Sequence, residues 1–307
     1  MTTNTARHIL TGNRARRRRE ALMRRLFLGS AATSILVSVA IVVSLLGEAY
    51  TFVANVDLAQ LYGIGWFPRR GVYDLRTILA GTLVVTGIAM VVAGPLGLGA
   101  AIYLSEYANP RVRRLLKPTL EVLAGIPSVV LGFFALTWIS PQVIKRIWEE
   151  AAGFNMGAAG LGVGILIIPL VASISEDALR AVPGSLREAS YGLGASRMLT
   201  SIRVVVPAAV SGIVASLIVA FSRAIGETMV VAIAAGATGG SIFTLDPSQP
   251  GQTMTAAMAA LAIGSDRVRG ADYAFQSLFF VGLLLFIMTF TLNVISERFV
   301  RRVRQKY

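Results

Sequence analysis

The sequence predicts an all-α integral membrane protein with six transmembrane helices. The chain has 307 residues, of which 55% are hydrophobic and only 15% charged, and its mean hydropathy is +0.68. A soluble domain carries about a quarter charged residues. Long apolar runs also recur along the chain, each sufficient to cross about 30 Å of hydrocarbon as a helix. A β-barrel would need strands that alternate apolar and polar residues, and runs such as SILVSVAIVVSLL show no alternation.

The apolar runs divide the chain into spans and connections. The six predicted spans cover residues 26–49, 77–104, 119–140, 157–177, 207–236 and 275–297. A basic arm (1–25) precedes the first span, an outer connection (50–76) follows it, and a basic tail (298–307) ends the chain. The first run is too long for a signal peptide, and no small-residue cleavage site follows it, so we expect a retained helix.

The 29 lysines and arginines alternate between the two sides of the predicted membrane. The arm, the second–third connection, the fourth–fifth connection and the tail hold 21 of them; the other side holds seven, and Arg223 lies within a span. Positive residues mark the cytoplasmic side, so both termini are predicted to be cytoplasmic. The run RARRRRE (14–20) then anchors the helix at anionic lipid headgroups, and the net charge of +13 does not indicate nucleic-acid binding.

The motifs that would indicate an enzyme or a metal site are missing. The sequence has no G-x-x-x-x-G-K-[ST] phosphate loop and no H-E-x-x-H, and its His, Asp and Glu residues show no metal-ligand spacing. There is no cysteine, and the only histidine, His8, lies in the polar arm. The pair Gly160 and Gly164 has the spacing of a close helix contact. We therefore predict no catalytic residues, no metal and no cofactor in this chain.

The fourth–fifth connection (180–206) is too apolar for an idle linker and too charged for a span. Ser185–Tyr191 is predicted to start a short helix, and Gly194 permits a tight turn. A second helical piece leads to Pro207, since proline is tolerated at a helix start. Ala189, Ser190 and Gly194 are small, so another protein could approach the backbone closely. A docking segment and an amphipathic interfacial loop are both compatible with this pattern.

This connection resembles the coupling loop of ABC-importer permeases, whose pattern is E-A-A, three residues, G, nine residues, I-x-L-P. The matching residues here are Glu188, Ala189, Ser190, Gly194 and Val204-x-Val206-Pro207, with Ser for Ala and Val for both Ile and Leu. The resemblance extends from about residue 81 to 302. It implies the type I ABC-importer permease fold over 77–297, in which this loop sits in a groove of the cytoplasmic ATPase subunit.

Finer motifs resemble the phosphate-uptake permeases of that family. These motifs are GTLVVTGIAMVVAGPLGLGAAIYLSEYA (81–108), LAGIPSVVLGFFAL (123–136) and SRAIGETMVV (222–231), while ETM and the ending LNVISERFVRR are more similar to the C-type than to the A-type subunit. The resemblance implies import of inorganic phosphate together with an A-type sister permease, an ATPase homodimer that binds Mg-ATP, and an extracytoplasmic phosphate-binding protein. A permease for molybdate or sulfate, and a secondary transporter that needs no ATPase, remain alternatives.

Two charges lie within the fifth span, at Arg223 and Glu227. Residues four apart share a helix face, so a purely structural ion pair is one interpretation. Intramembrane charges more often face a cavity or path, and an arginine fork matches phosphate oxygens. We therefore place Arg223 and Glu227 on the translocation path, together with Pro127 and Ser128, where proline can free a backbone carbonyl. Glu121, Glu176 and Asp177 are expected to form structural ion pairs near the cytoplasmic boundary.

Overall fold

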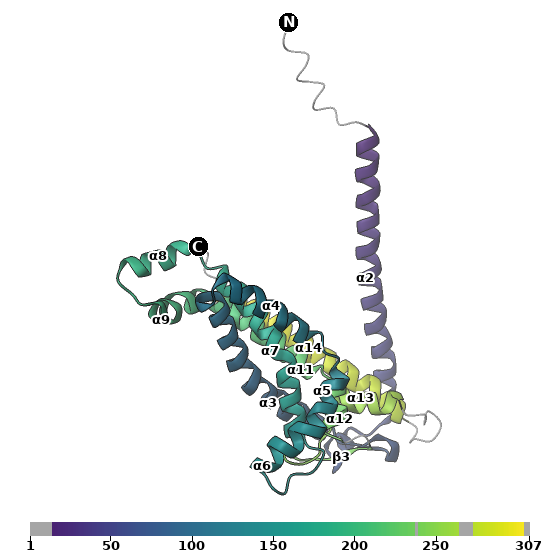
Figure 1. Ribbon diagram of the computed structural model, residues 1–307. Coiled ribbons are helices and arrows are strands. Elements are labelled where there is room, and N and C mark those ends of the chain that lie inside the picture. Colours follow the sequence, from purple (N-terminus) through teal and green to yellow (C-terminus); the bar gives the residue numbers. More distant parts are fainter. Residues whose placement is uncertain (1–13, 237–238, 264–272, 304–307) are drawn as a thin grey trace.

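A computed structural model describes residues 14–236, 239–263 and 273–303; His8, Arg267, Arg269 and residues 304–307 of the basic tail lie outside these ranges. The described chain forms a bundle whose long helices run between two ends (Figure 1). The α8 end carries α8 and α9, and the sheet end carries a small β-sheet. The helices are α2 (Arg14–Asn55), α3 (Leu75–Ile102), α4 (Pro110–Ala124), α5 (Ser128–Phe134), α6 (Lys145–Ile147), α7 (Met156–Arg180), α8 (Gly184–Gly192), α9 (Arg197–Thr200), α10 (Val206–Ala208), α11 (Val210–Ile225), α12 (Met229–Ala234), α13 (Met254–Ile263) and α14 (Ala274–Val303).

Five stretches of the described chain are long and apolar enough to cross a membrane. They are Arg19–Asn55, Leu75–Tyr107, Ser128–Ile147, Met156–Arg180 and Ala274–Arg298. A sixth results when Arg197–Ala208 and Val210–Ile225, which meet at 70°, are counted as one broken span. The predicted all-α membrane fold is therefore confirmed, and one of its six spans is bent.

The central contact of the bundle is between α3 and α7. Their backbones approach closely because glycines face the partner helix: a Cβ on Gly160 would lie 2.7 Å from the Cβ of Ile88, and one on Gly97 would lie 2.6 Å from the Cβ of Val171. Gly164 likewise faces the backbone of Ala89. In a membrane, where water does not drive helices together, such small residues allow the close packing that holds helices together. The predicted role of Gly160 and Gly164 in helix packing is confirmed.

A three-stranded antiparallel sheet closes the sheet end. Its strand order is β2 (Val72–Tyr73), β1 (Gly65–Phe67) and β3 (Ser241–Ile242), so the predicted outer connections after the first and fifth spans pair with each other. Trp66 pairs with Tyr73 on one side and with Ser241 on the other. Below this sheet, Phe52 of α2 stacks on Phe280 of α14 with ring centroids 5.1 Å apart. This cluster fixes the last turns of α2 against the bundle.

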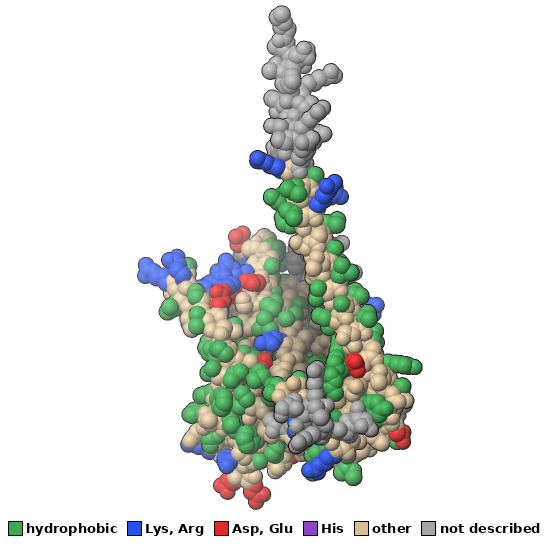
Figure 2. All heavy atoms as spheres, turned by 90° about the vertical axis from the view of Figure 1, so that its right-hand side faces the viewer, with side chains coloured by type: hydrophobic (Ala, Val, Ile, Leu, Met, Phe, Trp, Pro, Cys, Tyr) green, Lys and Arg blue, Asp and Glu red, His purple; other side chains and the backbone are tan. Residues whose placement is uncertain are grey.

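The rest of α2 stands away from the bundle (Figure 1). None of its most apolar 18-residue window is buried. Figure 2 shows hydrophobic side chains along this helix and over the middle of the bundle, with charged side chains mostly towards the two ends. Such a surface suits a chain whose middle lies in hydrocarbon.

The third predicted span, 119–140, is wrong in its boundaries. The chain breaks between α4, which is capped by Gly125, and α5, whose N-cap is Pro127. Proline disfavours helical geometry in the residue before it, here Ile126, and this favours a break between the two helices. The apolar stretch then continues through the π-helical turn Ala135–Ile144 to Ile147, and α4 is a separate helix without a buried residue.

The fifth predicted span, 207–236, is not one helix either. It consists of α10, α11 and α12, with breaks at Ala209 and at residues 226–228. Gly226 caps α11, and the carboxylate of Glu227 accepts bonds from the N–H groups of Met229 and Val230 at 3.2 and 3.4 Å. Glu227 therefore lies between two helices and caps the second, not inside a continuous helix.

Candidate functional site: the α8–α9 segment and the broken helices

The α8–α9 segment (residues 184–200) forms a helix, a turn and a second helix at one end of the bundle (Figure 1). Gly194 has φ +81°, a left-handed conformation that glycine adopts without steric cost. Ser196 then caps α9 by accepting a bond from the N–H of Leu199. The helix–turn–helix predicted for the connection 180–206 is present, with Gly194 at its turn.

The outer surface of this segment is open and partly apolar. Glu188, Ala189 and Gly194 are exposed, and Leu193 is 90% exposed. Ser190 turns inward, where its hydroxyl lies 2.8 Å from that of Thr200. Tyr191, Met198 and Leu199 of the same segment are also exposed. Several exposed apolar side chains on one short segment are the arrangement expected of a surface that another protein covers. Three of the predicted loop residues are thus exposed on this segment, and Ser190 supports the turn through its bond to Thr200.

Pro207 lies farther along, in the first turn of the short helix α10. The chain changes direction by 70° between this helix and α11, at Ala209. The π-helical turn Ser201–Val205 joins α9 to α10. Pro207 is exposed, but it lies at a bend between the α8–α9 segment and α11, outside residues 184–200.

Arg187 attaches α8 to the rest of the bundle, a role that the sequence analysis missed. Its Nη1 donates to the carbonyl of Val182 at 2.7 Å, and its Nη2 donates to the carbonyl of Leu179 at 2.9 Å. Nη2 and Nε also donate to the two carboxylate oxygens of Glu106 at 2.8 and 3.3 Å. Glu106 lies in the π-helical turn that follows α3, and Ser105 donates a further bond to it. The side chain of Glu106 is only 4% exposed.

A second ionic cluster surrounds Glu176, whose side chain is fully buried near the end of α7. Arg113 and Lys117 of α4 bind it at 2.7 and 3.0 Å, and Lys117 also binds Asp177 at 3.1 Å. Burial alone would lower the pKa of Lys117, but hydrogen bonds from its ammonium to Glu176 and Asp177 outweigh this, so its pKa is raised. The predicted structural ion pairs of Glu176 and Asp177 are confirmed, and they hold α4 against α7.

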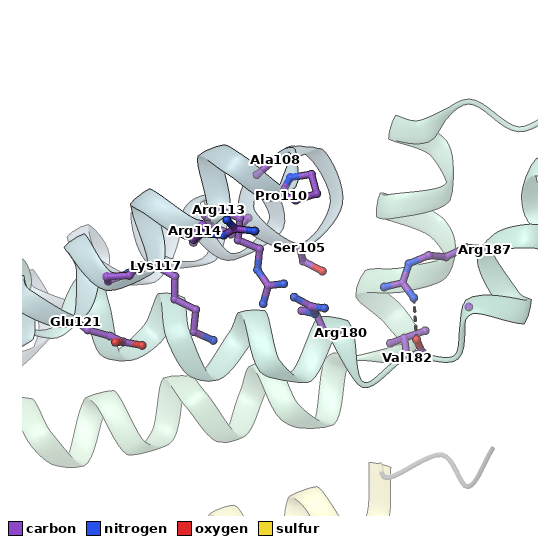
Figure 3. A pocket seen from close by; sticks show the side chains of 13 residues that line it. Ser105, Ala108, Pro110, Arg113, Arg114, Lys117, Glu121, Arg180, Val182 and Arg187 are labelled. Carbon is purple, nitrogen blue, oxygen red and sulfur yellow. Dashed lines mark hydrogen bonds between the residues drawn. The ribbon is translucent and has the colours of Figure 1, made fainter.

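A cavity of about 770 Å³ lies between these two clusters (Figure 3). Its lining residues are Leu104, Ser105, Ala108, Pro110, Arg113, Arg114, Lys117, Pro118, Glu121, Arg180, Val182, Gly184 and Arg187. Glu121, predicted to form an ion pair, is exposed at its rim. Most of the cations are directed at buried carboxylates behind the cavity, so the cavity is a junction between helices with little excess positive charge.

Arg223 and Glu227 meet across the end of α11. Nη2 of Arg223 lies 3.6 Å from a carboxylate oxygen of Glu227, which is longer than a good charge-assisted hydrogen bond. The other carboxylate oxygen caps α12, and the backbone carbonyl of Glu227 accepts a bond from Thr255 at 2.7 Å. The side chain of Glu227 is 4% exposed and that of Arg223 is 54% exposed. The pair is therefore asymmetric, with a fixed carboxylate and an open guanidinium.

Pro127 and Ser128 lie at the start of α5, the helix that packs against α12. Gly132 makes this contact close, since a Cβ there would lie 3.1 Å from the side chain of Ile233. The carbonyl that Pro127 was expected to free is that of Leu123, and it accepts a bond from the N–H of Ile126 at 3.2 Å. It is therefore not a free ligand for a passing ion. Pro127 and Ser128 thus begin the helix that packs against α12, the helix that Glu227 caps.

No three His, Cys, Asp or Glu side chains lie together in a way that could hold a metal ion within residues 14–236, 239–263 and 273–303. The clusters described above are instead carboxylate–cation pairs that join one helix to the next. What the arrangement offers chemically is a half-exposed guanidinium at Arg223 and an exposed, partly apolar surface on the α8–α9 segment.

Comparison with known proteins places these features in a family. Residues 93–306 match the family described as binding-protein-dependent transport system inner membrane component. The phosphate transport system permease protein PstC of Mesorhizobium japonicum is 30% identical over 319 residues, which cover 93% of this chain and 94% of that protein. The phosphate transport system permease protein PstA 1 of Mycobacterium tuberculosis is 38% identical over 174 residues, which cover 56% of this chain and 54% of that protein.

The fold comparison agrees. A chain in the crystal structure of a bacterial alginate ABC transporter, in complex with an alginate-bound periplasmic protein, superposes with a TM-score of 0.67. The match covers 94% of this chain and 97% of that chain at 13% identity, so it shows the fold alone. The six-span bundle is that of a type I ABC-importer permease. The chain belongs to the family of binding-protein-dependent transport system inner membrane components.

Proposed function

We propose that this chain is a membrane-spanning permease subunit of an ATP-driven importer of inorganic phosphate, of the C-type. Family membership and the names of its relatives support this proposal. The C-type is favoured because the match to PstC extends over most of both chains, whereas the match to PstA covers about half. One such chain forms half of the translocation path.

The observation that carries the substrate class is the asymmetric pair at the end of α11. The N–H groups of α12 and the hydroxyl of Thr255 hold Glu227 in place. The guanidinium of Arg223 can therefore turn its N–H donors towards another group while residues 226–228 keep their conformation. A guanidinium presents paired N–H groups that match two oxygens of a phosphate. At rest Glu227 offsets the cost of the charge on Arg223; an arriving oxyanion takes over the contact and later releases it. The binding is weak enough for passage.

The α8–α9 segment is the proposed contact with a separate ATPase. Its exposed surface, Glu188, Ala189, Leu193 and Gly194, suits a groove on that partner. The partner binds Mg-ATP and hydrolyses it, and no catalytic step falls to this chain. An A-type sister permease, a second copy of the ATPase and an extracytoplasmic phosphate-binding protein complete the transporter. In the proposed assembly the protein lies in the cell membrane, with the α8 end and both termini on the cytoplasmic side.

Uptake by the reconstituted complex tests the substrate. Proteoliposomes that contain both permeases and the ATPase, supplied with the binding protein and internal ATP, should accumulate radiolabelled phosphate. An excess of unlabelled phosphate should compete, and equal concentrations of sulfate or molybdate should not. Accumulation of sulfate or molybdate in place of phosphate would assign the chain to another oxyanion. Uptake that persists without the ATPase would indicate a secondary transporter.

A further inference from the structure

The two faces of α8 are used differently. Glu188 and Ala189 face solvent, whereas the side chain of Arg187 is 20% exposed and points back into the bundle. Consecutive residues of a helix point in different directions, so one short helix can present a docking surface and an internal anchor together. In Figure 3 the guanidinium of Arg187 points away from α8 towards Val182, at the end of α7.

The groups that Arg187 binds lie at the ends of α3 and α7, the two helices that form the central contact of the bundle. Leu179 and Val182 lie at the end of α7, and Glu106 lies at the end of α3. These two helices are packed backbone to backbone through Gly97 and Gly160. On its other side, the chain continues from the α8–α9 segment into α11 through the 70° bend at Ala209, and Leu186 of α8 packs against the apolar cluster that contains Leu179 and Ile213. We therefore expect a movement of α8 to be passed on to α3 and α7 through the bonds of Arg187, whereas the bend at Ala209 lets α8 move relative to α11.

We propose that Arg187, clamped by Glu106, is the positioning residue that transmits movement of α8 to the α3–α7 pair. This inference rests on the proposed docking of an ATPase on the α8–α9 segment. The guanidinium donates four bonds in one plane, two to carbonyls and two to one carboxylate, which fixes both the distance and the rotation of α8. A lysine ammonium is a point charge and cannot reproduce this planar arrangement.

The experiment measures coupling in the assembled transporter. In proteoliposomes, Arg187→Gln should keep the ATPase bound and hydrolysing, while the phosphate transported per ATP hydrolysed falls about tenfold, as expected for loss of several charge-assisted bonds. Arg187→Lys should lie between this variant and the wild type. Glu106→Gln should also lower the ratio, and the double variant should be no worse than Arg187→Gln alone, because both changes remove the same contact. The matched control is Arg114→Gln, an exposed arginine that lines the same cavity, and it should behave as the wild type.

An unchanged ratio in an assembled Arg187→Gln complex would overturn the inference. So would a parallel loss of uptake and ATP hydrolysis together with loss of the ATPase, because that result indicates a structural role only. Failure of the proposed function gives a different result, since the wild-type complex would then fail to take up phosphate. Stimulation of ATP hydrolysis by the loaded binding protein serves as a second readout of coupling, and Arg187→Gln should lose that stimulation as well.

Discussion

In the proposed function, Arg223 is a charged side chain in an apolar helix that stays open to a ligand, since its side chain is 54% exposed. A charge at the bilayer centre costs about 2.5–3.5 kcal/mol on insertion scales, so a nearby carboxylate is needed. Glu227 supplies it, but its own position is set by the N–H groups of α12 and by Thr255. The carboxylate therefore stays in place whether or not Arg223 contacts it.

Substitutions at Arg223 test this at the level of the residue. Arg223→Ala should lower phosphate uptake by at least about tenfold, because a hydrogen bond to a charged group is worth about 1.5–3 kcal/mol. Arg223→Lys should recover little of this, since it lacks the planar fork. The ATPase should still copurify with both variants. Wild-type uptake in Arg223→Ala would contradict the anion-contact interpretation.

At Glu227, two substitutions can separate the effect of the negative charge from the effect of capping α12. Glu227→Gln keeps an oxygen that can accept from Met229 and Val230, so α12 should remain capped and only the negative charge is lost. Uptake should fall less than in Arg223→Ala, whereas Glu227→Ala, which removes the cap as well, should also lower the thermal stability of the complex. Equal stability of the two Glu227 variants, measured by thermal unfolding in detergent, would show that the cap contributes little.

Helices were easier to predict than their breaks. The apolar runs located the spans because hydrocarbon demands long apolar helices, and Gly194 was identified as a turn because it stands between two helical patterns. Pro127 and Gly226 gave no such signal, since membrane helices tolerate both residue types. Whether they end a helix depends on groups far along the chain, such as Thr255, which binds the carbonyl of Glu227.

The same limit applies to the ionic clusters. Glu176 was expected to be paired, but its partner Arg113 on α4 is 63 residues away in the sequence. The neighbouring contact between Lys117 and Asp177 joins residues that are 60 apart. Arg187 stands directly before the recognisable loop residue Glu188, yet its partner Glu106 lies at the end of another helix. Such pairs follow from the packing of α3, α4 and α7, which no local pattern contains.

Docking through the α8–α9 segment can be tested with substitutions that separate the effect of a bulkier side chain from the effect of backbone strain. A Cβ on Gly194 would meet no atom within 4 Å, but a leucine there would have to adopt φ +81°, at a cost of about 1–2 kcal/mol. Asparagine tolerates this conformation, and Ala189 is an exposed helical position without strain. We expect Gly194→Leu and Ala189→Leu to uncouple ATP hydrolysis from phosphate uptake and Gly194→Asn to stay near wild type. Normal ATP-driven uptake in both leucine variants would exclude docking through this surface.

At the scale of the whole molecule, both ends of the bundle carry arginines, so orientation depends on how many positive residues each side holds. The connection between α7 and α11 and the start of α4 lie at the α8 end, and α14 runs back towards it (Figure 1). These segments, with the basic arm, contain most of the lysines and arginines, and positive segments remain on the cytoplasmic side. We therefore expect the sheet end, in which the outer connections pair as β1 and β3, to face outward.

Single cysteines can decide the orientation, because the natural chain has none to remove. Ser185 of α8 and Gln249, in the loop before α13, are both exposed, whereas Ser248 beside it is buried and would react poorly. A membrane-impermeant maleimide should label Ser185→Cys only in inside-out vesicles and Gln249→Cys only in right-side-out vesicles. Detergent-opened vesicles should label both and serve as the control. Labelling of Ser185→Cys from outside would reverse the orientation and remove the α8–α9 segment from reach of any cytoplasmic ATPase, so this measurement bears on the coupling proposal as well as on the topology.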